Sequence, residues 1–378
     1  MKINVNVVSA DISVQIIDAF YAYIQSGLNE RIADWDIDIT NTHNDAADVN
    51  IIWANKDTTV NINANYYDIV VISNAGEPVT VSSSLIHNIW QNNNVFLVFN
   101  SLLTQDHSLY NKVIPFLDAA QQCRDYWTRY FYPHYHIANK LKKIQRSKDL
   151  IAINGLNRTV RHYFFKLLNE KTNIKILKNI STDIVNTNHS YWETKEDFEF
   201  RNYLEEQYSN VFEPEPDYKY YDNAKHIGIN NKFGKINPGY ELLPEYFEYR
   251  CIIFPESSWQ NNELALTEKA LKCFYAGSLP FPIAGANVNS LYNSLGFATA
   301  WNLLPKYLQC FDSEQDHFKR IEQQINALKW FEDNAMVFQT AQYTELTRQN
   351  MINMLTYSPI EFGIQKLIRI IDERRRRH

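Results

Sequence analysis

Short apolar runs alternate with helix-spaced segments along the first part of the chain. Residues 14–24 carry apolar side chains at helical spacing, whereas the β-branched and aromatic runs are bounded by Asn, Asp or Gly. Such runs are typical of buried parallel strands. The pattern therefore predicts an α/β fold with strands at residues 3–8, 37–39, 49–53, 68–72 and 95–99.

A second α/β pattern begins near residue 150. Residues 150–154 and 174–177 read as strands on either side of a helix at 158–168, which together form a β-α-β unit. Gly277 and Gly296 stand where a left-handed residue would end a helix. The later elements predicted are strands at 249–254 and 279–284 and helices at 267–276, 289–295, 321–333 and 359–374.

Chain length and the linker pattern predict two domains. A chain of 378 residues exceeds the roughly 250–300 residues that one core serves efficiently. A predicted helix at 116–144 and a Lys-rich stretch at 140–148 separate the two patterns, and residues 213–239 read as a long loop. We therefore expect domains at 1–145 and 146–358, followed by a helix at 359–378 that could cross back to the first domain. Two such domains facing each other would hold a ligand between the carboxyl ends of their strands.

Charge is distributed unevenly along the chain. The net charge of −6 argues against a protein whose whole surface coats nucleic acid. Residues 101–168, however, contain eleven Lys or Arg against four Asp or Glu, and aromatic residues interleave the segment from Arg124 to Lys148. That composition suits phosphates and bases, and it equally suits the solvated basic face of an amphipathic helix.

The sequence argues against several classes of function. No apolar stretch approaches the roughly 20 residues of a membrane span, and no export signal is visible, so we expect a soluble cytoplasmic protein. The four cysteines form no CxxC pair, and no GxGxxG, GxxxxGK[ST], HExxH or GxSxG motif occurs. Asp36 and Asp38 mimic a metal-binding DxD, but an acidic surface strand explains them more simply, and we predict no metal.

The candidate chemistry lies at the start of the helix predicted at 267–276. Thr267, Glu268 and Lys269 occupy its beginning, where free backbone N–H groups and the helix dipole favour an anion. Lys269 adds a positive charge, and the Glu268 carboxylate could accept hydrogen bonds from the vicinal hydroxyls of a ribose. Diphosphate and ribose together make a nucleotide. The alternative is a capping threonine followed by an ordinary surface lysine.

The surrounding residues resemble a known donor site. The stretch FPESSWQNNELALTEKALKCFYAGSLPFPIAGANVNSLYNSLGF, residues 254–297, resembles the nucleotide-sugar segment of GT-B glycosyltransferases, particularly the fucosyltransferase family. It looks even more like phage and large-virus glycosyltransferase-like proteins, whose "LxxLGF" segment is matched at 291–297. The same group has a strand ending in Asn before an Arg-rich helix start, matched at 153–162. The resemblance covers residues 150 to about 330.

The resemblance implies a fold and an activity. The fold would be GT-B-like, with two Rossmann-like domains facing across a cleft. The activity would be metal-independent transfer of a hexose or pentose from a nucleotide-diphosphate donor, with no separate cofactor, in a cytoplasm that could be an infected host's. Glu268 would contact the ribose, and Lys269 the phosphates. The other residues implied at the donor are Asn154, Arg158, Arg161, Glu256, Ser257 and Thr267, while Lys272 would be solvated.

The catalytic base and the acceptor stay open. A base on the first domain could be Asp11, Glu77 or the pair Asp106 and His107, and Glu77 is favoured because its Gly-Pro-flanked loop follows a convincing strand. The acceptor would be either a glycan or a hydroxymethylated base of duplex DNA guided by residues 124–148. The alternative function is a nucleotide- or carbohydrate-binding module of GT-B shape without turnover.

Overall fold

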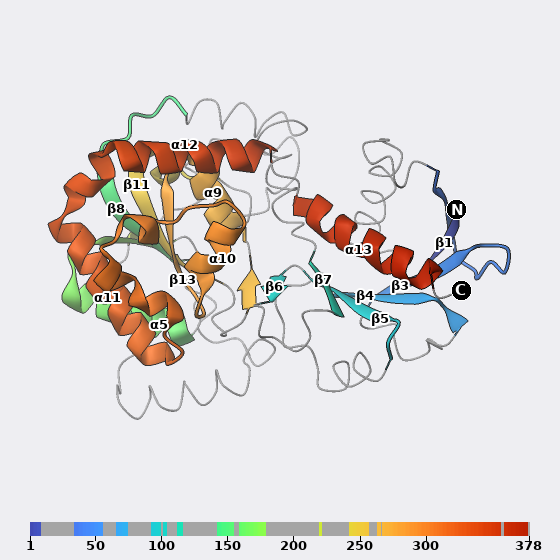
Figure 1. Cartoon of the computed structure of the whole chain (residues 1–378). Coiled ribbons are helices and arrows are strands. Elements are labelled where there is room, and N and C mark those ends of the chain that lie inside the picture. The colour runs from blue at the N-terminus through green and yellow to red at the C-terminus, as the bar shows by residue number, and fades with distance from the viewer. Residues whose placement is uncertain are drawn as a thin grey trace. The chain divides into compact units, whose positions relative to one another are not determined.

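The computed structural model of the chain divides into two compact units (Figure 1). The first comprises Met1–Gln121 and Ser358–His378, and the second Gln122–Tyr357. The structure describes residues 1–8, 34–55, 66–74, 92–99, 101–103, 112–115, 142–154, 159–178, 219–220, 242–256, 263–265, 267–356 and 359–376.

The first unit is built on a six-stranded parallel sheet with the strand order β2-β1-β3-β4-β5-β7. The predicted strands are confirmed, and β7 is an addition of three residues that the apolar pattern did not reveal. The strands are β1 Lys2–Val7, β2 Asp36–Thr40, β3 Val49–Asn55, β4 Ile69–Asn74, β5 Val95–Phe99 and β7 Val113–Pro115, and the short strand β6 covers Ser101–Leu103.

Helix α13, Pro359–Arg375, covers one face of this sheet (Figure 1). Ile364, Leu367, Ile368 and Ile371 of α13 pack with Ile3, Val5, Ile51 and Val71 of the strands. Because side chains alternate along a strand, Asn4 and Asn50 point to the opposite face, where the Asn4 amide donates to the Asn50 oxygen at 3.0 Å. The end of the chain therefore completes the core of the first unit.

The second unit holds a five-stranded parallel sheet with the order β10-β9-β8-β11-β13. The chain leaves the central strand β8 toward β9 on one side and continues through β11 and β13 on the other. This reversal creates a switch point between β8 and β11, where open α/β sheets bind ligands at the carboxyl ends of the strands. The bounds are β8 Lys148–Asn154, β9 Lys175–Lys178, β10 Lys219–Tyr220, β11 Tyr249–Pro255 and β13 Leu279–Ile283, and the short strand β12 covers Glu263–Ala265. Strand β10 falls inside the stretch predicted as loop.

Helices surround this second sheet. Helix α5, Thr159–Lys171, and helix α11, His317–Asp333, pack with β13 around Phe164, Phe281 and Phe331. The α/β character predicted for both halves of the chain is confirmed. The remaining helices are α8 Glu245–Glu248, α9 Glu268–Ala276, α10 Val288–Ser294, α12 Ala341–Thr356 and α13, with 3-10 helices η8 Ala300–Leu303, η9 Lys306–Ser313 and η10 Ala335–Gln339.

Helix α12 escaped the sequence pattern because polar residues occupy its buried face. Thr347 and Asn350 are buried there between Tyr343 and Met354. The Asn350 side chain accepts from the Ala298 N–H at 2.7 Å and donates to the Ala298 carbonyl at 2.8 Å. These hydrogen bonds satisfy a buried polar face of α12. A helix with such a face lacks the periodic apolar residues from which an amphipathic helix is predicted.

Two glycines end helices as predicted. Gly277 follows α9 at φ 76°, and Gly296 lies after α10 at φ 84°. Both angles lie in the left-handed region that glycine adopts at low cost. Among the described helices, none is long and apolar enough to cross a membrane.

Candidate functional site

Glu256 stands at the carboxyl end of β11, beside the switch point. Its backbone N–H donates to the Ile283 carbonyl at the end of β13 at 2.9 Å, which continues the sheet by one more bond. On the other side, β11 pairs with β8 through Ile253 and Ala152, so that Asn154 ends the neighbouring strand. The residue is therefore held by the sheet at the edge where ligands bind.

The Glu256 carboxylate is buried and accepts two side-chain hydrogen bonds. The Thr267 hydroxyl donates to Oε2 at 2.6 Å, and the Tyr292 hydroxyl donates to Oε1 at 3.1 Å. Thr267 lies at the start of α9 and Tyr292 within α10. The carboxylate thus connects the start of α9 and the body of α10 to the end of strand β11.

Lys269 lies between two carboxylates. Its ammonium nitrogen is 3.7 Å from Glu256 Oε2 and 3.6 Å from Glu268 Oε1, and its side chain is 17% exposed. Partial burial keeps these charges in a lower dielectric than bulk water, where each interaction is stronger. The Glu256 and Glu268 carboxylates therefore hold the Lys269 ammonium at the edge of the sheet.

The two carboxylates differ in protonation chemistry. Burial raises the pKa of Glu256, and the nearby Lys269 and the Thr267 hydrogen bond only partly oppose this effect. For Glu268 burial also acts upward, but the positive charges of Lys269 and Lys272 outweigh it, so the pKa of Glu268 is lowered. Glu268 therefore stays a carboxylate that can accept hydrogen bonds from hydroxyls.

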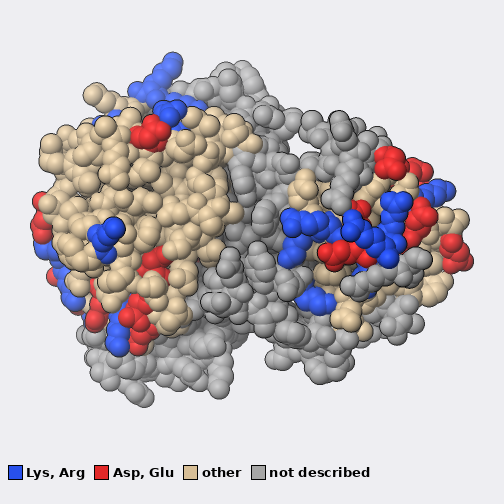
Figure 2. Space-filling model, viewed as in Figure 1, with Lys and Arg blue, Asp and Glu red and all other residues tan. Residues whose placement is uncertain are grey.

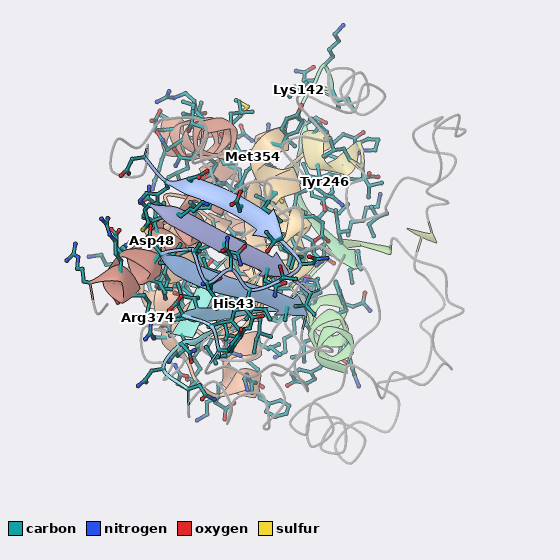
Figure 3. All side chains as sticks on the ribbon, turned by 90° about the vertical axis from the view of Figure 1, so that its right-hand side faces the viewer. His43, Asp48, Lys142, Tyr246, Met354 and Arg374 are labelled. Atoms are coloured by element: carbon teal, nitrogen blue, oxygen red, sulfur yellow. The ribbon has the colours of Figure 1, made fainter. Side chains whose placement is uncertain are left out.

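Lys272 is buried, which corrects the expectation of a solvated side chain. It is 5% exposed and its ammonium lies 5.9 Å from the centre of the Tyr246 ring (Tyr246 is labelled in Figure 3). Its positive charge acts on Glu268 and lowers the pKa of that carboxyl. Lys272 thus belongs to the electrostatics of the site.

The first turn of α9 carries no side-chain cap, although Thr267 occupies the capping position. The Thr267 hydroxyl is directed to Glu256 instead. The neighbouring helix α10 is different, because Asp312 Oδ1 accepts from the Asn289 N–H at 2.8 Å and Oδ2 from the Ser290 N–H at 3.0 Å. Asp312 therefore occupies the start of α10, whereas at the start of α9 the Glu268 carboxylate accepts from its own backbone N–H and Thr267 provides no cap.

The structure brings together Glu256, Thr267, Glu268 and Lys269 from the predicted donor set. It describes the backbone of Asn154 at the end of β8 and of Arg161 in the first turn of α5, but not their side chains. The predicted residues Asp11, Glu77, Asp106, His107, Arg158 and Ser257 lie outside the described residues.

Sequence reasoning missed Tyr292. It lies in the "LxxLGF" segment, where helical spacing marked it as an ordinary apolar position. The side chain is indeed fully buried, and it contacts the Phe274 ring at 6.1 Å between ring centres. Only the fold shows that its hydroxyl reaches Glu256.

Three basic residues of the segment from Arg124 to Lys148 have partners within the second unit. The Arg146 guanidinium donates to the Ala276 carbonyl at 2.6 Å, to the Gly277 carbonyl and to Phe247 O at 3.3 Å. The Lys148 ammonium pairs with Glu248 at 2.7 Å, and that of Lys142 lies 4.2 Å from the Tyr275 ring centre (Lys142 is labelled in Figure 3).

These contacts also explain a difference in secondary structure. The helix predicted as far as residue 144 is a turn over residues 142–144. The turn allows the Arg146 side chain to reach the last carbonyls of α9, which gain a cation at the negative end of the helix.

The acidic pair on β2 has no metal-site geometry in the described structure. Asp36 and Asp38 are both exposed. Within the described ranges, no three His, Cys, Asp or Glu side chains group as metal ligands would.

No protein-family model and no curated protein sequence matches the chain. Solved structures show a distant similarity. The E. coli trehalose-6-phosphate structure bound with UDP-2-fluoro glucose is 9% identical, with a TM-score of 0.44 over 87% of this chain and 73% of that one. An α,α-trehalose 6-phosphate synthase from Burkholderia multivorans is 10% identical, with a TM-score of 0.42 over 86% and 72% of the two chains.

The wall teichoic acid polymerase TagF is 9% identical, with a TM-score of 0.31 over 98% of this chain and 89% of that one. TM-scores of this size carry no argument about activity. The function is therefore argued from the residues of the site.

Proposed function

We propose that the protein is a glycosyltransferase that moves a sugar from a nucleotide-diphosphate donor to an acceptor hydroxyl. One observation carries the proposal: Glu256, Thr267, Glu268 and Lys269 meet at the carboxyl edge of a parallel sheet, next to its switch point. Parallel α/β sheets bind nucleotides at this place.

The donor's diphosphate fits the start of α9. Its oxygens would accept hydrogen bonds from the Lys269 ammonium and from backbone N–H groups of the first turn, where the Glu268 N–H would exchange its own carboxylate for the ligand. The ribose hydroxyls would donate to the Glu268 carboxylate, which stays ionised because lysines lower its pKa. The positive charge of Lys269 and the acceptor carboxylate of Glu268 thus belong to adjacent residues in one helical turn.

Glu256 has a positioning role in this proposal. Its carboxylate lies 3.7 Å from the Lys269 ammonium and holds Thr267, the residue that begins α9. It thereby sets the direction of the helix start and of the lysine head group. Arg158 and Arg161 are proposed as further diphosphate ligands from the α5 start, since a guanidinium fork suits the oxygens of a phosphate.

The reaction places two demands on the protein. The bond between the donor's anomeric carbon and the diphosphate oxygen breaks, and the acceptor oxygen takes the diphosphate's place on that carbon while its proton passes to a base. Lys269 and the α9 start would stabilise the charge that develops on the diphosphate, without a metal. Glu77 and Asp11 are proposed as candidate bases.

The acceptor is proposed to be a glycan or small sugar hydroxyl. Arg146 and Lys142 have partners within the second unit and Lys148 is paired with Glu248, so fewer cations of the segment from Arg124 to Lys148 are available to the phosphates of duplex DNA. A hydroxymethylated DNA base is the second acceptor, and a gel shift of duplexes with and without that base separates the two.

Replacement of Lys269 tests the donor site. Lys269→Ala should weaken binding of nucleoside diphosphates by about 1–3 kcal/mol, measured by calorimetry with UDP, GDP and CDP. Lys175→Ala is the matched control, because Lys175 is an exposed lysine at the opposite, amino-terminal end of β9. Equal affinity in the parent and Lys269→Ala would contradict the assignment.

Turnover separates the enzyme from a binding module. The parent should hydrolyse its donor slowly even without acceptor, and Glu268→Gln should reduce that rate together with the affinity. Tight donor binding with no hydrolysis and no transfer to any acceptor would favour a non-catalytic nucleotide-binding module.

A further inference from the structure

The described hydrogen-bond partners of the Glu256 carboxylate suit either of its protonation states. The Thr267 hydroxyl donates to Oε2 at 2.6 Å, and the Tyr292 hydroxyl donates to Oε1 at 3.1 Å. A hydroxyl both donates and accepts, because it carries one hydrogen and two lone pairs. Each of these hydroxyls can therefore turn its hydrogen away and accept a hydrogen bond from a protonated Glu256.

Asp312, a second buried carboxylate of this unit, is held in a different way. Its oxygens accept from the backbone N–H groups of Asn289 and Ser290 at 2.8 Å and 3.0 Å, and from the Asn289 side-chain amide at 3.0 Å. The Ser290 hydroxyl makes the fourth printed contact at 2.6 Å. An N–H group can only donate, whereas a hydroxyl can exchange roles. Glu256 thus has on both oxygens the kind of partner that tolerates a proton.

The Lys269 ammonium connects Glu256 to the proposed donor. This ammonium lies 3.7 Å from Glu256 Oε2, and in the proposed function it binds the donor diphosphate. A phosphate oxygen held about 2.9 Å from the ammonium would lie no more than about 6.6 Å from Oε2. The donor and the carboxylate therefore compete for one positive charge.

Burial makes this competition strong. Glu256 is 4% exposed, and charges interact more strongly where water is excluded. Burial raises the pKa of Glu256, whereas the positive charge of Lys269 lowers it. A diphosphate bound to Lys269 would offset that positive charge and add negative charge nearby. Both effects favour the protonated form of Glu256.

The other described groups that face Glu256 keep their charge states. Burial raises the pKa values of Tyr246 on α8, Cys273 on α9 and Tyr292 on α10, so these three groups stay neutral. Glu268 stays ionised, because Lys269 and Lys272 lower its pKa. Figure 2 shows mostly uncharged side chains over α9 and α10 on the face turned to the viewer. Proton exchange in this cluster therefore falls to Glu256.

We propose that Glu256 takes up a proton from solvent when a nucleotide sugar binds at the start of α9, and that it thereby releases the Lys269 ammonium to the donor diphosphate. The proton bonds to one carboxylate oxygen, and the hydroxyl beside that oxygen turns to accept. Glu256 acts here as a positioning residue, through Lys269. This inference rests on the proposed function and adds to it a dependence of donor binding on pH.

Linkage gives the size of the effect. An anion this close should raise the pKa of Glu256 by about one unit or more. Because the coupling is reciprocal, the donor should bind about tenfold more tightly below this pH window than above it. Proton uptake should reach about half a proton midway between the two pKa values. A Glu256 that serves only as a permanent counter-ion predicts no proton exchange and a constant affinity.

Calorimetry of the full-length chain tests the proposal. UDP-glucose, GDP-mannose and ADP-glucose are titrated in two buffers of different ionisation enthalpy at several pH values between 5.5 and 8. The diphosphate of a nucleotide sugar is esterified at both ends and binds no proton in this range, so the difference in heat between the buffers counts protons taken up by the protein. We expect uptake in the parent and an affinity that decreases as pH rises.

Two variants assign the proton. Glu256→Gln resembles the protonated carboxyl, so it should bind the donor without proton uptake, at an affinity that does not change with pH and equals that of the parent at low pH. Glu245→Gln is the matched control and should keep the uptake of the parent. Glu245 is also buried, but it lies in α8, which directly precedes the amino-terminal end of β11.

A second measurement keeps the test valid if Glu256→Gln folds poorly. Glutamate labelled with carbon-13 at the side-chain carboxyl reports the pKa of Glu256 in the parent, with the signal assigned by its loss in Glu256→Asp. The donor should raise that pKa. Donor binding without proton uptake, or with an unchanged Glu256 pKa, would overturn this inference alone. If none of the three nucleotide sugars binds the parent, the proposed function is contradicted and the inference with it.

Discussion

The Thr267 hydroxyl donates to the Glu256 carboxylate at 2.6 Å and so connects the start of α9 to the end of β11. A threonine at this position would ordinarily cap its own helix by accepting a backbone N–H. Here the hydroxyl donates to a buried carboxylate, and Thr267 provides no side-chain cap for the first turn of α9. The hydrogen bond fixes the start of α9 against the end of the central strand.

Replacing Thr267 tests this connection. Thr267→Val keeps the shape of the side chain but leaves the buried Glu256 carboxylate with one donor fewer, which should lower the free energy of unfolding by about 1–3 kcal/mol. Thr267→Ser retains the hydroxyl and should lie close to the parent. Urea denaturation measures both variants, and equal losses in the two would show that the hydrogen bond contributes nothing.

Glu256 should make stability depend on pH. The pKa of Glu256 is raised in the folded protein, so protons bind the folded state more tightly, and the carboxyl's contribution to stability decreases as pH rises past its ordinary pKa of 4.5 toward the raised value. Glu256→Gln does not titrate, so the stability of this variant relative to the parent should increase between pH 4 and pH 8. Denaturation curves at several pH values measure the difference. A constant difference across that range would contradict the raised pKa.

Arg146 should be essential to the second unit because it satisfies the end of α9. The guanidinium donates to the carbonyls of Tyr246, Phe247, Ala276 and Gly277 and to the Tyr343 hydroxyl, whereas the ammonium of Arg146→Lys has three N–H donors and loses at least two of these bonds. We expect a loss of about 2–3 kcal/mol in the free energy of unfolding, at about 1 kcal/mol for each hydrogen bond lost.

Arg348→Lys is the control for that variant. Arg348 forms an exposed ion pair with Glu345 on α12, and exposed pairs of this kind contribute little to stability. Its melting temperature should match the parent's. If Arg146→Lys also had the melting temperature of the parent, the guanidinium contacts at the end of α9 would contribute nothing to stability.

His317 predicts an acid-sensitive contact at the start of α11. Its Nδ1 lies 2.5 Å from the Arg320 guanidinium, and burial together with the charge of Arg320 lowers the pKa of His317 to about 4. The unfolded chain takes up the proton first, so the stability that the neutral ring contributes is present above pH 6.5 and is lost as pH falls toward 4.

His317→Gln removes this titration and keeps an acceptor for Arg320. Between pH 6.5 and pH 4 the parent should lose about 1–2 kcal/mol more than the variant, a value discounted for the partial exposure of the ring. Denaturation at both pH values measures this difference. Parallel loss of stability in the two proteins would mean that the imidazole protonates in the folded state as it does in solution.

The local sequence determined most strands of both sheets, though not β7 or β10, and the end of α9. Buried parallel strands need continuous apolar runs, and these runs are visible without any knowledge of the fold. Gly277 was likewise predictable as the end of a helix, since few other residues adopt its left-handed backbone angle without cost. For the same reason the sequence indicated Glu268 and Lys269, whose chemistry depends on their place in the first turn of one helix.

Only the tertiary structure decided how the site is assembled. Tyr292 meets Glu256 from 36 residues away and Arg146 meets Gly277 from 131 residues away. Contacts of this length leave no local period in the sequence, because they depend on the order in which strands join the sheet and on which loop reaches which edge. Helix α12 was hidden for a related reason: its buried Asn350 is polar, and its partner is a backbone group of residue 298 that only the fold brings near.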